Sequence, residues 1–550
     1  MPACRRQGIC DLGFYRERET LVSEVKCLNW RKVKEMNLAE ILSNSVRKYP
    51  EKLALIFEDT RLTYQAFNER CNRLANSFAT LGIGEGDHFA ILSKNCHQYL
   101  EMFFAAAKTG ALFVPLNYRL SPRELIYTIN DSESQILFFA REYLPVVQNI
   151  EKDLKGVHTT ICIDDKIAEM DSYEELLTRA KPSEPDSSSI DEEDLVGIFY
   201  TSGTTGYPKG AMVTHKNRIT DMIHQVTDFE YIEPEDIYLN IGPLFHVGVL
   251  ALPLAHLYMG CTVVILKEFD AKKIFELIEK EKIRAFWAAP TMVQMLLDYP
   301  EGKKYNLDSI KTIAYSSSPM PMEIMKRAME FFGHNVFVQF FGSTETGPQI
   351  THLSRKDHVL QGTERQLKKL RSVGVESQMV HVRIVDDEDR DVHIGKIGEI
   401  IVKSDAVTKG YWKKPEETQK AIKNGWYHTG DLGYMDEDRY IYIVDRKKDM
   451  IITGGENVYS AEVENVLYMH PAIAEAAVIG VPHEKWVEAI KAVIVLKPGA
   501  KATEQEIIEF CKQNLASYKK PAYVEFVKEM PKTSMGKILK RELRELYGKP

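Results

Sequence analysis

The sequence lacks any apolar run of the roughly 18 to 20 residues that a membrane-spanning helix requires, so we expect no transmembrane segment. Its amino-terminal stretch, MPACRRQGICDLGFYRERET, has no apolar core and is not a secretory signal. The formal net charge of −8 predicts no positive surface of the kind that binds nucleic acid. The eight cysteines form no CxxC pair and no His/Cys cluster, so we expect reduced thiols in a cytoplasmic protein without structural zinc.

The chain is long, and its composition is that of a globular protein. Its 550 residues exceed what one hydrophobic core supports, so it should divide into two or more domains. Residues 1–35 show little commitment to structure, and a helix-like pattern begins at Met36. Two interpretations stay open for this segment: either Met36 is a natural start that an extension precedes, or residues 1–35 are an ordinary N-terminal arm.

Apolar strands and helices alternate through the middle of the chain. The repeated strand–helix–strand spacing predicts a mainly parallel sheet that is covered by helices on both faces. We expect strands at 262–266, 284–288, 310–315 and 336–341, and helices at 271–281, 291–297 and 322–332. The residues after 450 form a second, shorter pattern of strands and helices, which predicts a small α/β domain.

One loop, YTSGTTGYPKG at residues 200–210, follows a short apolar strand at 195–200. It contains three glycines, four hydroxyl side chains and one cation: Gly203, Gly206, Gly210, Thr201, Ser202, Thr204, Thr205 and Lys209. Glycine brings backbone N–H groups close to a ligand, and hydroxyls add donors that rotate to fit phosphate oxygens. The Walker spacing is absent. The loop therefore predicts a polyphosphate site of another type, and the alternative is a flexible polar surface loop.

This loop resembles the signature of the adenylate-forming superfamily, which comprises acyl-CoA synthetases, firefly luciferase and the adenylation domains of peptide synthetases. Further motifs of AMP-forming acyl-CoA synthetases follow in the expected order between about residues 38 and 541: PLFHVG at 243–248, QFFGSTE at 339–345, WYHTGD at 426–431 and PKTSMGK at 531–537. The resemblance implies an α/β fold with a large N-terminal domain of layered, mainly parallel sheets plus a distorted barrel, and a small, mobile α+β C-terminal domain. It places these domains at 36–446 and 447–550, with a hinge near Lys448.

The resemblance also implies which residues bind ATP, Mg²⁺ and coenzyme A. Thr201 and Glu345 would hold Mg²⁺, and Asp431 would accept both ribose hydroxyls. The implied cofactor-binding residues are Thr201, Ser202, Gly203, Thr204, Thr205, Gly206, Lys209, Ser316, Ser317, Ser318, Phe340, Phe341, Gly342, Ser343, Thr344, Asp431, Ile443, Arg446, Lys448, Gly454, Gly455, Glu456 and Lys537. Two positions depart from the family pattern: Phe341 replaces a tyrosine, and serines at 316–318 replace a glycine-rich loop.

For the reaction itself, the resemblance implies catalysis by Lys537, Thr201, Glu345 and His246. The wall of the acid site would comprise His246, Val247, Gly248, Trp287 and Gly342. These residues are mostly apolar, which favours an aliphatic or aryl acid over a polar one. We therefore expect an ATP-dependent carboxylic acid:CoA ligase acting on a medium- or long-chain fatty acid, and an aryl or alicyclic acid, such as benzoate, coumarate or cyclohexanecarboxylate, is the alternative.

Readings from other classes are less well supported by the residues. An adenylation domain that charges a carrier protein would need an aspartate near the PLFHVG element, where His246 stands. A non-catalytic nucleotide-binding module would be expected to lose Lys537 or Glu345, and both are present. Luciferase-like oxidation shares every adenylation motif and needs a particular substrate. The expected partners are a small carboxylic acid and CoA, and a homodimer is possible.

Overall fold

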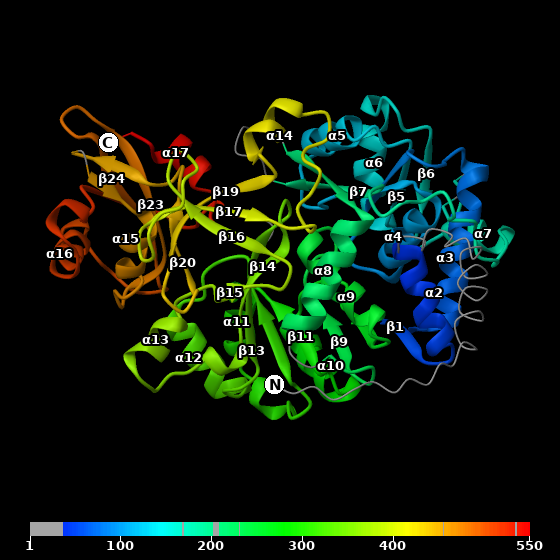
Figure 1. Ribbon diagram of the computed structural model, residues 1–550, viewed down its shortest axis with the longest axis horizontal. Helices are drawn as coiled ribbons and strands as arrows, with labels where there is room; N and C mark the ends of the chain where they lie inside the picture. The colour runs from blue at the N-terminus through cyan, green and yellow to red at the C-terminus, as the bar shows by residue number, and fades with distance from the viewer. Residues whose placement is uncertain are drawn as a thin grey trace, which may run out of the picture. The chain divides into compact units, whose positions relative to one another are not determined.

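The structure is a computed structural model that describes residues 37–167, 170–201, 208–229, 232–454, 456–533 and 536–549. The two interpretations of residues 1–35 therefore concern a segment outside the described residues. Asn37–Pro550 form one compact unit. Four sheets and their helices make up this unit (Figure 1).

A six-stranded sheet carries the glycine-rich loop. Its strand order is β6-β5-β3-β4-β7-β8, and all neighbours are parallel except β7 and β8. The strands are β3 (His88–Leu92), β4 (Leu112–Pro115), β5 (Ile136–Phe139), β6 (Thr159–Cys162), β7 (Leu195–Thr201) and β8 (Lys209–Thr214). The loop therefore connects two antiparallel strands. The sequence prediction anticipated the apolar strand β7 but not β8, whose KGAMVT has no clear alternation.

A nine-stranded sheet follows, with the order β15-β14-β13-β12-β11-β9-β10-β1-β2. Its middle strands are parallel, and both edges are antiparallel. The strands are β1 (Leu53–Phe57), β2 (Thr60–Thr63), β9 (Ile237–Asn240), β10 (Thr262–Ile265), β11 (Ala285–Ala288), β12 (Thr312–Tyr315), β13 (Phe337–Ser343), β14 (Gly347–Leu353) and β15 (Val375–Glu376). The expected parallel strands are confirmed at β10 to β13.

Helices cover these two sheets, and the largest hydrophobic core contains side chains from both sheets and from the helices. They are α2 (Leu38–Lys48), α3 (Tyr64–Phe78), α4 (His97–Thr109), α5 (Pro122–Asp131), α6 (Leu144–Ile150), α7 (Tyr173–Arg179), α8 (His215–Asp228), α9 (Val247–Tyr258), α10 (Ala271–Glu281), α11 (Pro290–Leu297) and α12 (Met322–Phe332). The core joins buried side chains of both sheets to those of α3 and α4, among them Phe67, Phe104, Phe113 and Val263. Helix α8 begins at a capping box of Thr214 and Asn217, directly after β8.

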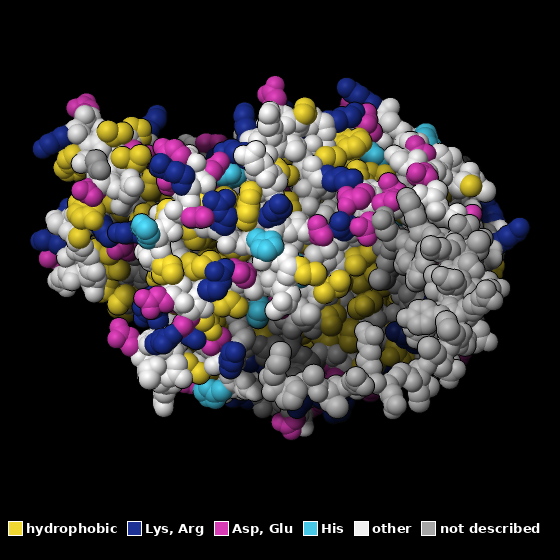
Figure 2. All heavy atoms as spheres, viewed as in Figure 1, with side chains coloured by type: hydrophobic (Ala, Val, Ile, Leu, Met, Phe, Trp, Pro, Cys, Tyr) yellow, Lys and Arg dark blue, Asp and Glu magenta, His cyan; other side chains and the backbone are white. Residues whose placement is uncertain are grey.

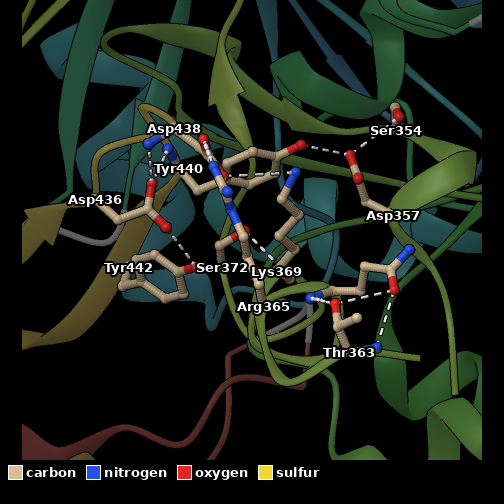
Figure 3. A network of polar contacts seen from close by, with 11 residues as sticks. Ser354, Asp357, Thr363, Arg365, Lys369, Ser372, Asp436, Asp438, Tyr440 and Tyr442 are labelled. Carbon is tan, nitrogen blue, oxygen red and sulfur yellow. Dashed lines mark hydrogen bonds and ion pairs between the residues drawn. The ribbon is translucent and has the colours of Figure 1, made fainter. Parts of the chain in front are cut away.

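A third sheet is entirely antiparallel and leads toward the C-terminal part. It consists of β16 (His381–Val385), β17 (Gly398–Lys403), β18 (Ile422–Lys423), β19 (Trp426–Met435) and β20 (Ile441–Arg446), with α13 (Glu364–Lys369) and α14 (Pro415–Ala421) nearby in the chain. Figure 3 shows how polar contacts fix the turn between β19 and β20: the Tyr440 hydroxyl donates to Asp357 at 2.9 Å, and Arg365 donates to Asp438 at 2.6 Å. These contacts anchor the strand that ends at Arg446.

The C-terminal residues form a small sheet of their own. It contains β21 (Ile451–Thr453), β22 (Glu456–Val458), β23 (Ile473–His483), β24 (Val487–Leu496) and β25 (Tyr523–Phe526), with α15 (Ser460–Leu467), α16 (Glu504–Asn514) and α17 (Lys540–Tyr547). Figure 1 shows β23 and β24 side by side, in orange. The large N-terminal part of sheets and the small C-terminal sheet confirm the expected α/β architecture.

The surface and the cysteines can be compared with the expectations from composition. Figure 2 shows basic and acidic side chains interspersed over the described residues of one face. Within the described ranges, no helix combines the length and the apolar character that crossing a bilayer requires. Five cysteines lie in these ranges, all of them free thiols in buried positions: Cys71, Cys96, Cys162, Cys261 and Cys511.

Candidate functional site

The two ends of the glycine-rich loop face each other across the β7–β8 pair. Thr201 and Lys209 are cross-strand partners, and the Thr201 hydroxyl donates to the Lys209 carbonyl at 3.4 Å. The predicted phosphate-binding residues between them, Ser202, Gly203, Thr204, Thr205 and Gly206, lie outside the described residues. The strands thus fix where the loop begins and ends.

Lys209 is held in a largely buried, mixed-charge setting. Its ammonium pairs with the carboxylate of Glu417 on α14 and lies 5.3 Å from the centre of the Tyr411 ring. Burial lowers the pKa of Lys209, the charge of Glu345 opposes this, and nearby Lys420 and Lys414 lower it further. Lys209 and Glu345, from two different sheets, therefore share one electrostatic environment.

Two tyrosine hydroxyls lead to Glu345. The Tyr411 hydroxyl donates to Oε1 of Glu345 at 2.9 Å, and the Tyr427 hydroxyl donates to that of Tyr411. Burial, reinforced by the Glu345 charge, raises the pKa of both tyrosines, so both remain hydrogen-bond donors at neutral pH. The backbone N–H of Thr408 also donates to the Glu345 carbonyl at 2.9 Å. The Glu345 side chain is thus oriented from one side.

Asp431 and Arg446 form an ion pair between β19 and β20. They are cross-strand partners, and Nε of Arg446 lies 2.6 Å from Oδ1 of Asp431. Burial raises the pKa of Asp431, while the charges of Arg446 and Lys537 oppose that rise. The backbone N–H of Asp431 donates to the Thr429 hydroxyl at 3.0 Å, which fixes the turn before the carboxylate.

Lys537 of the C-terminal tail lies close enough to this pair for the charges of both residues to shift its pKa. Its residue surface as a whole is exposed, yet enough protein surrounds the ammonium that burial lowers the pKa of Lys537 to about 8. Arg446 lowers this pKa too, and Asp431 raises it. A Cβ atom at the preceding Gly536 would lie 3.1 Å from the hydroxyl of Thr291 on α11. The tail therefore docks on the large N-terminal part.

Close contacts surround several residues of the predicted wall of the acid site. The Trp287 indole N–H donates to the Ser316 hydroxyl at 2.8 Å. A Cβ atom at Gly248 would lie 3.1 Å from Pro348, and one at Gly342 would lie 2.5 Å from the Pro348 carbonyl carbon. Glycine is therefore needed at 342, because strand β14 approaches its backbone too closely for a side chain. Val247, which precedes Gly248 in the sequence, is buried.

His246 precedes helix α9. Its ring lies 4.5 Å from that of Phe245, centre to centre. Burial, followed by the charge of Arg119, lowers the pKa of His246 to about 3. The imidazole is therefore neutral at physiological pH.

The remaining predicted residues occupy three regions. Ser317 has a positive φ of 77° after β12, next to Ser316 and Ser318. Phe340 is buried on β13, and Phe341, Ser343 and Thr344 follow it with part of their surface exposed. Ile443 lies on β20. Burial lowers the pKa of Lys448. The backbone N–H of Gly454 donates to the Trp486 carbonyl at 3.0 Å, within the C-terminal sheet. Glu456 is exposed on β22, and Gly455 lies outside the described residues.

Polar contacts also tie the connection at 445–449 to the C-terminal helices. Asp445 accepts from the Ser460 hydroxyl at 2.8 Å, at the start of α15. Arg544 of α17 pairs with Asp449 at 2.7 Å, and Lys540 pairs with Glu464 at 2.7 Å. Helix α17 was not anticipated from the sequence.

Sequence reasoning missed Tyr411, Tyr427 and Glu417. The contact between Tyr411 and Glu345 joins residues 66 positions apart. The available signal was the WYHTGD element, which contains Tyr427, but it was interpreted through Asp431 alone.

Comparison with known proteins gives matches over nearly the whole chain. The family described as AMP-binding enzyme matches residues 42–412, and the AMP-binding enzyme C-terminal domain matches residues 462–537. Feruloyl-CoA synthase from Amycolatopsis sp. is 35% identical over 503 residues, which cover 91% of this chain and 97% of that protein. Long-chain-fatty-acid–CoA ligase FadD13 from Mycobacterium tuberculosis is 35% identical over 491 residues, covering 89% and 94%. The ATP-bound structure of MatB from Rhodopseudomonas palustris has a TM-score of 0.82 at 29% identity, covering 93% and 99%.

The environment of Lys537 leads to a prediction about its titration. Because only the neutral amine reacts with acylating reagents, labelling of Lys537 should rise with pH around a midpoint near 8. Replacing Arg446 with Met should raise the midpoint, and Asp431→Asn should lower it, since the first removes a like charge and the second an opposite one. Mass spectrometry of the labelled peptide measures this, with Lys497 as internal reference. A midpoint that neither substitution moves would contradict the described position of Lys537.

Proposed function

The chain belongs to the AMP-binding enzyme family and is an acid–thiol ligase of the acyl-CoA synthetase class, and on this premise we propose which residues carry its reaction and which acid it activates. The proposal depends chiefly on one observation: the charges of Asp431 and Arg446, in the large N-terminal part, act on the ammonium of Lys537 from the C-terminal tail. The charges of Glu345 and Arg446 both act on Tyr427, so Glu345 lies near the same region.

The chemistry explains why a cation is needed there. A carboxylate is a poor acyl donor, because its leaving group would be oxide. Attack of the carboxylate on the α-phosphate of ATP releases pyrophosphate and gives an acyl-adenylate, from which AMP leaves readily when the CoA thiolate attacks. Both reactants of the first step are anions, so catalysis consists mainly of positioning and charge stabilisation.

The residues suit these roles. Lys537 would contact the α-phosphate and the attacking carboxylate, and Lys209 with the hydroxyls of the glycine-rich loop would hold the β- and γ-phosphates. Asp431 has two acceptor oxygens for a vicinal diol, so it would bind the ribose, with Arg446 beside it. Lys209 now pairs with Glu417, and the triphosphate would replace that carboxylate as the partner of the ammonium.

Glu345 fits a magnesium site together with Thr201. Mg²⁺ binds few protein carboxylates and takes most of its oxygens from phosphates and water. Tyr411 donates to Oε1 of Glu345, and the carboxylate keeps further acceptor capacity with which it would hold the metal. When bound, Mg²⁺ would neutralise phosphate charge. Tyr411 and Tyr427 would hold the Glu345 carboxylate in the orientation that this contact needs.

For the thioester step we infer a rotation of residues 447–550 about Lys448. It would withdraw Lys537 and bring Gly454, Gly455 and Glu456 toward the CoA. The contact of Asp449 with Arg544 supports this boundary, because it joins the start of the moving part to helix α17. The contact of Asp445 with Ser460 crosses the boundary, so the rotation would break it. A few residues at the end of an element commonly act as such a hinge.

We further propose that the protein is a cytoplasmic enzyme of fatty acid metabolism, and the acid site bears on the substrate. Trp287, Val247, Gly248 and Gly342 present mainly apolar surface, and the neutral His246 adds no charge. A medium- or long-chain fatty acid fits this wall, and an aryl or alicyclic acid is the second candidate. The relative named feruloyl-CoA synthase, at 35% identity, supports the second as strongly as FadD13 supports the first.

Lys537→Ala should abolish most of the first step. We expect acid-dependent ATP–pyrophosphate exchange to fall by about 10²–10³-fold, because one preorganised cation at a developing charge contributes roughly 3 to 4 kcal/mol. Lys532→Ala is the matched control, since Lys532 lies in the same loop but pairs with Glu475 at 2.7 Å. Equal losses in both variants would contradict the assigned role.

Tyr411→Phe should weaken the use of Mg²⁺ while keeping the ring against which Lys209 packs. We expect the Mg²⁺ concentration for half-maximal exchange to rise about tenfold, the lower end of the range for loss of a group that orients a metal ligand. Binding of Mn²⁺ with ATP, followed by electron paramagnetic resonance, gives a second readout. Tyr442→Phe removes a hydroxyl that donates to Asp436 at 2.9 Å and should change neither value.

A further inference from the structure

A buried pair of opposite charges lies on α8, outside the site described so far. Arg218 and Asp221 are three residues apart, pair with each other, and expose none of their side-chain surface. Helix α8 packs against α9 and β14. Burying two charges costs several kcal/mol for each ion, and an apolar pair of similar volume is often at least as stable. The pair therefore calls for an explanation other than stability.

Two atoms of the pair have no partner among the described residues. Nε of Arg218 is a buried donor without an acceptor, and Oδ1 of Asp221 is a buried acceptor without a donor. The other Arg218 contacts are accounted for, since Nη2 pairs with Oδ2 of Asp221 and Nη1 donates to the Val247 carbonyl at 3.4 Å. Buried polar atoms almost always have a partner in proteins, in the chain, in water or in a ligand.

The pair lies next to residues of the wall of the acid site. Arg218 contacts the backbone of Val247, the residue after His246. Oδ1 of Asp221 is the atom that a Cβ at Gly347 would meet first, and the Gly347 carbonyl in turn packs against Gly342. Val247 and Gly342 are two of the five residues assigned to that wall. The pair is thus one contact away from the acid site on two sides.

The charges of the pair select the kind of group that could join it. Asp221 is the counter-ion of Arg218, and the charge of Arg218 opposes the rise in the pKa of Asp221 that burial causes. A second carboxylate would add a buried charge without a counter-ion. A hydroxyl adds no charge, donates one hydrogen bond and accepts another. It would therefore satisfy Oδ1 of Asp221 and Nε of Arg218 together.

We propose that Arg218 and Asp221 form the far end of the acid site and that the preferred substrate is a carboxylic acid with a hydroxyl group distant from its carboxylate. This inference rests on the proposed function and deepens it, since it names the substrate class. The expected substrate changes accordingly from an unsubstituted acid to a hydroxy acid, because the proposed site has an apolar wall and a polar far end. An acid without the hydroxyl would leave both atoms unpartnered.

The wild-type enzyme provides the first test. Straight-chain acids of graded length are compared in three forms, with a terminal methyl, hydroxyl or carboxylate, together with cinnamate and 4-hydroxycinnamate as an aryl pair. The measured quantity is kcat/KM for CoA-thioester formation. We expect one hydroxy acid to exceed both its methyl and its carboxylate counterpart by at least about tenfold, because a site built for a hydroxyl discriminates strongly against acids that lack it.

Variants then assign the preference to the pair. In Arg218→Leu/Asp221→Leu both charges disappear together, and the ratio of hydroxy to unsubstituted acid should fall to about 1. Asp221→Asn leaves Arg218 without its counter-ion, so this variant should shift the preference from the hydroxy acid toward the dicarboxylic acid. Arg284→Leu/Asp236→Leu is the matched control, because this Arg–Asp pair at 2.9 Å precedes β11 and β9, at the ends of those strands away from the site. The ratio should keep its wild-type value in the control.

The outcomes separate this inference from the proposed function. If some acid forms a thioester but no hydroxy acid is preferred, the pair is structural and its free atoms bind water, which overturns the inference alone. A preference of the wild-type enzyme for the dicarboxylic acid also overturns it. If no acid in any form yields a thioester, the proposed function itself fails. A double variant that does not fold leaves the wild-type series and Asp221→Asn to decide.

Discussion

The ion pair between Asp431 and Arg446 is the interaction on which the arrangement of the site depends. It joins β19 to β20 at the point where the chain leaves the antiparallel sheet for the C-terminal one. Lys537 returns to the same pair from the far end of the chain, and both charges act on its ammonium. The N-terminal and C-terminal parts therefore meet twice at this pair: the backbone passes from one part to the other at 446–450, and the tail lysine returns to it. Because Asp431 is also the proposed ribose ligand, nucleotide binding and the position of the tail would be coupled.

Backbone pairing brings the other components to this point. Strand β8 is bridged to the segment around Tyr411, since Trp412 donates to the Gly210 carbonyl at 2.8 Å and Met212 donates to that of Gly410 at 2.9 Å. The Tyr411 hydroxyl then reaches Glu345 after β13. One segment thus holds the end of the glycine-rich loop and the carboxylate of the proposed metal site in a fixed relation. Packing, rather than loop flexibility, sets the geometry on this side.

The sequence predicted those features that depend on local pattern. Helix α12 was expected at 322–332 and spans Met322–Phe332, and the apolar strand before the glycine-rich loop lies where periodicity placed it. Family membership followed from contiguous motifs and is confirmed. Strands β8 and β14 were missed because each is defined by an antiparallel neighbour rather than by its own alternation. The roles proposed for Tyr411 and for the Arg218–Asp221 pair could not be predicted from the sequence. They depend on contacts with residues distant in the chain and on burial, which composition does not encode. The roles of the site residues stay predictions.

The central claim is that Lys537 serves formation of the adenylate and is withdrawn before the thioester forms. Single-turnover kinetics of Lys537→Ala tests this most directly, with thioester formation followed once from ATP, acid and CoA and once from preformed acyl-adenylate and CoA. We expect a loss of about 10²–10³-fold from ATP and a rate within about threefold of wild type from the adenylate. Equal losses from both starting points would contradict this claim.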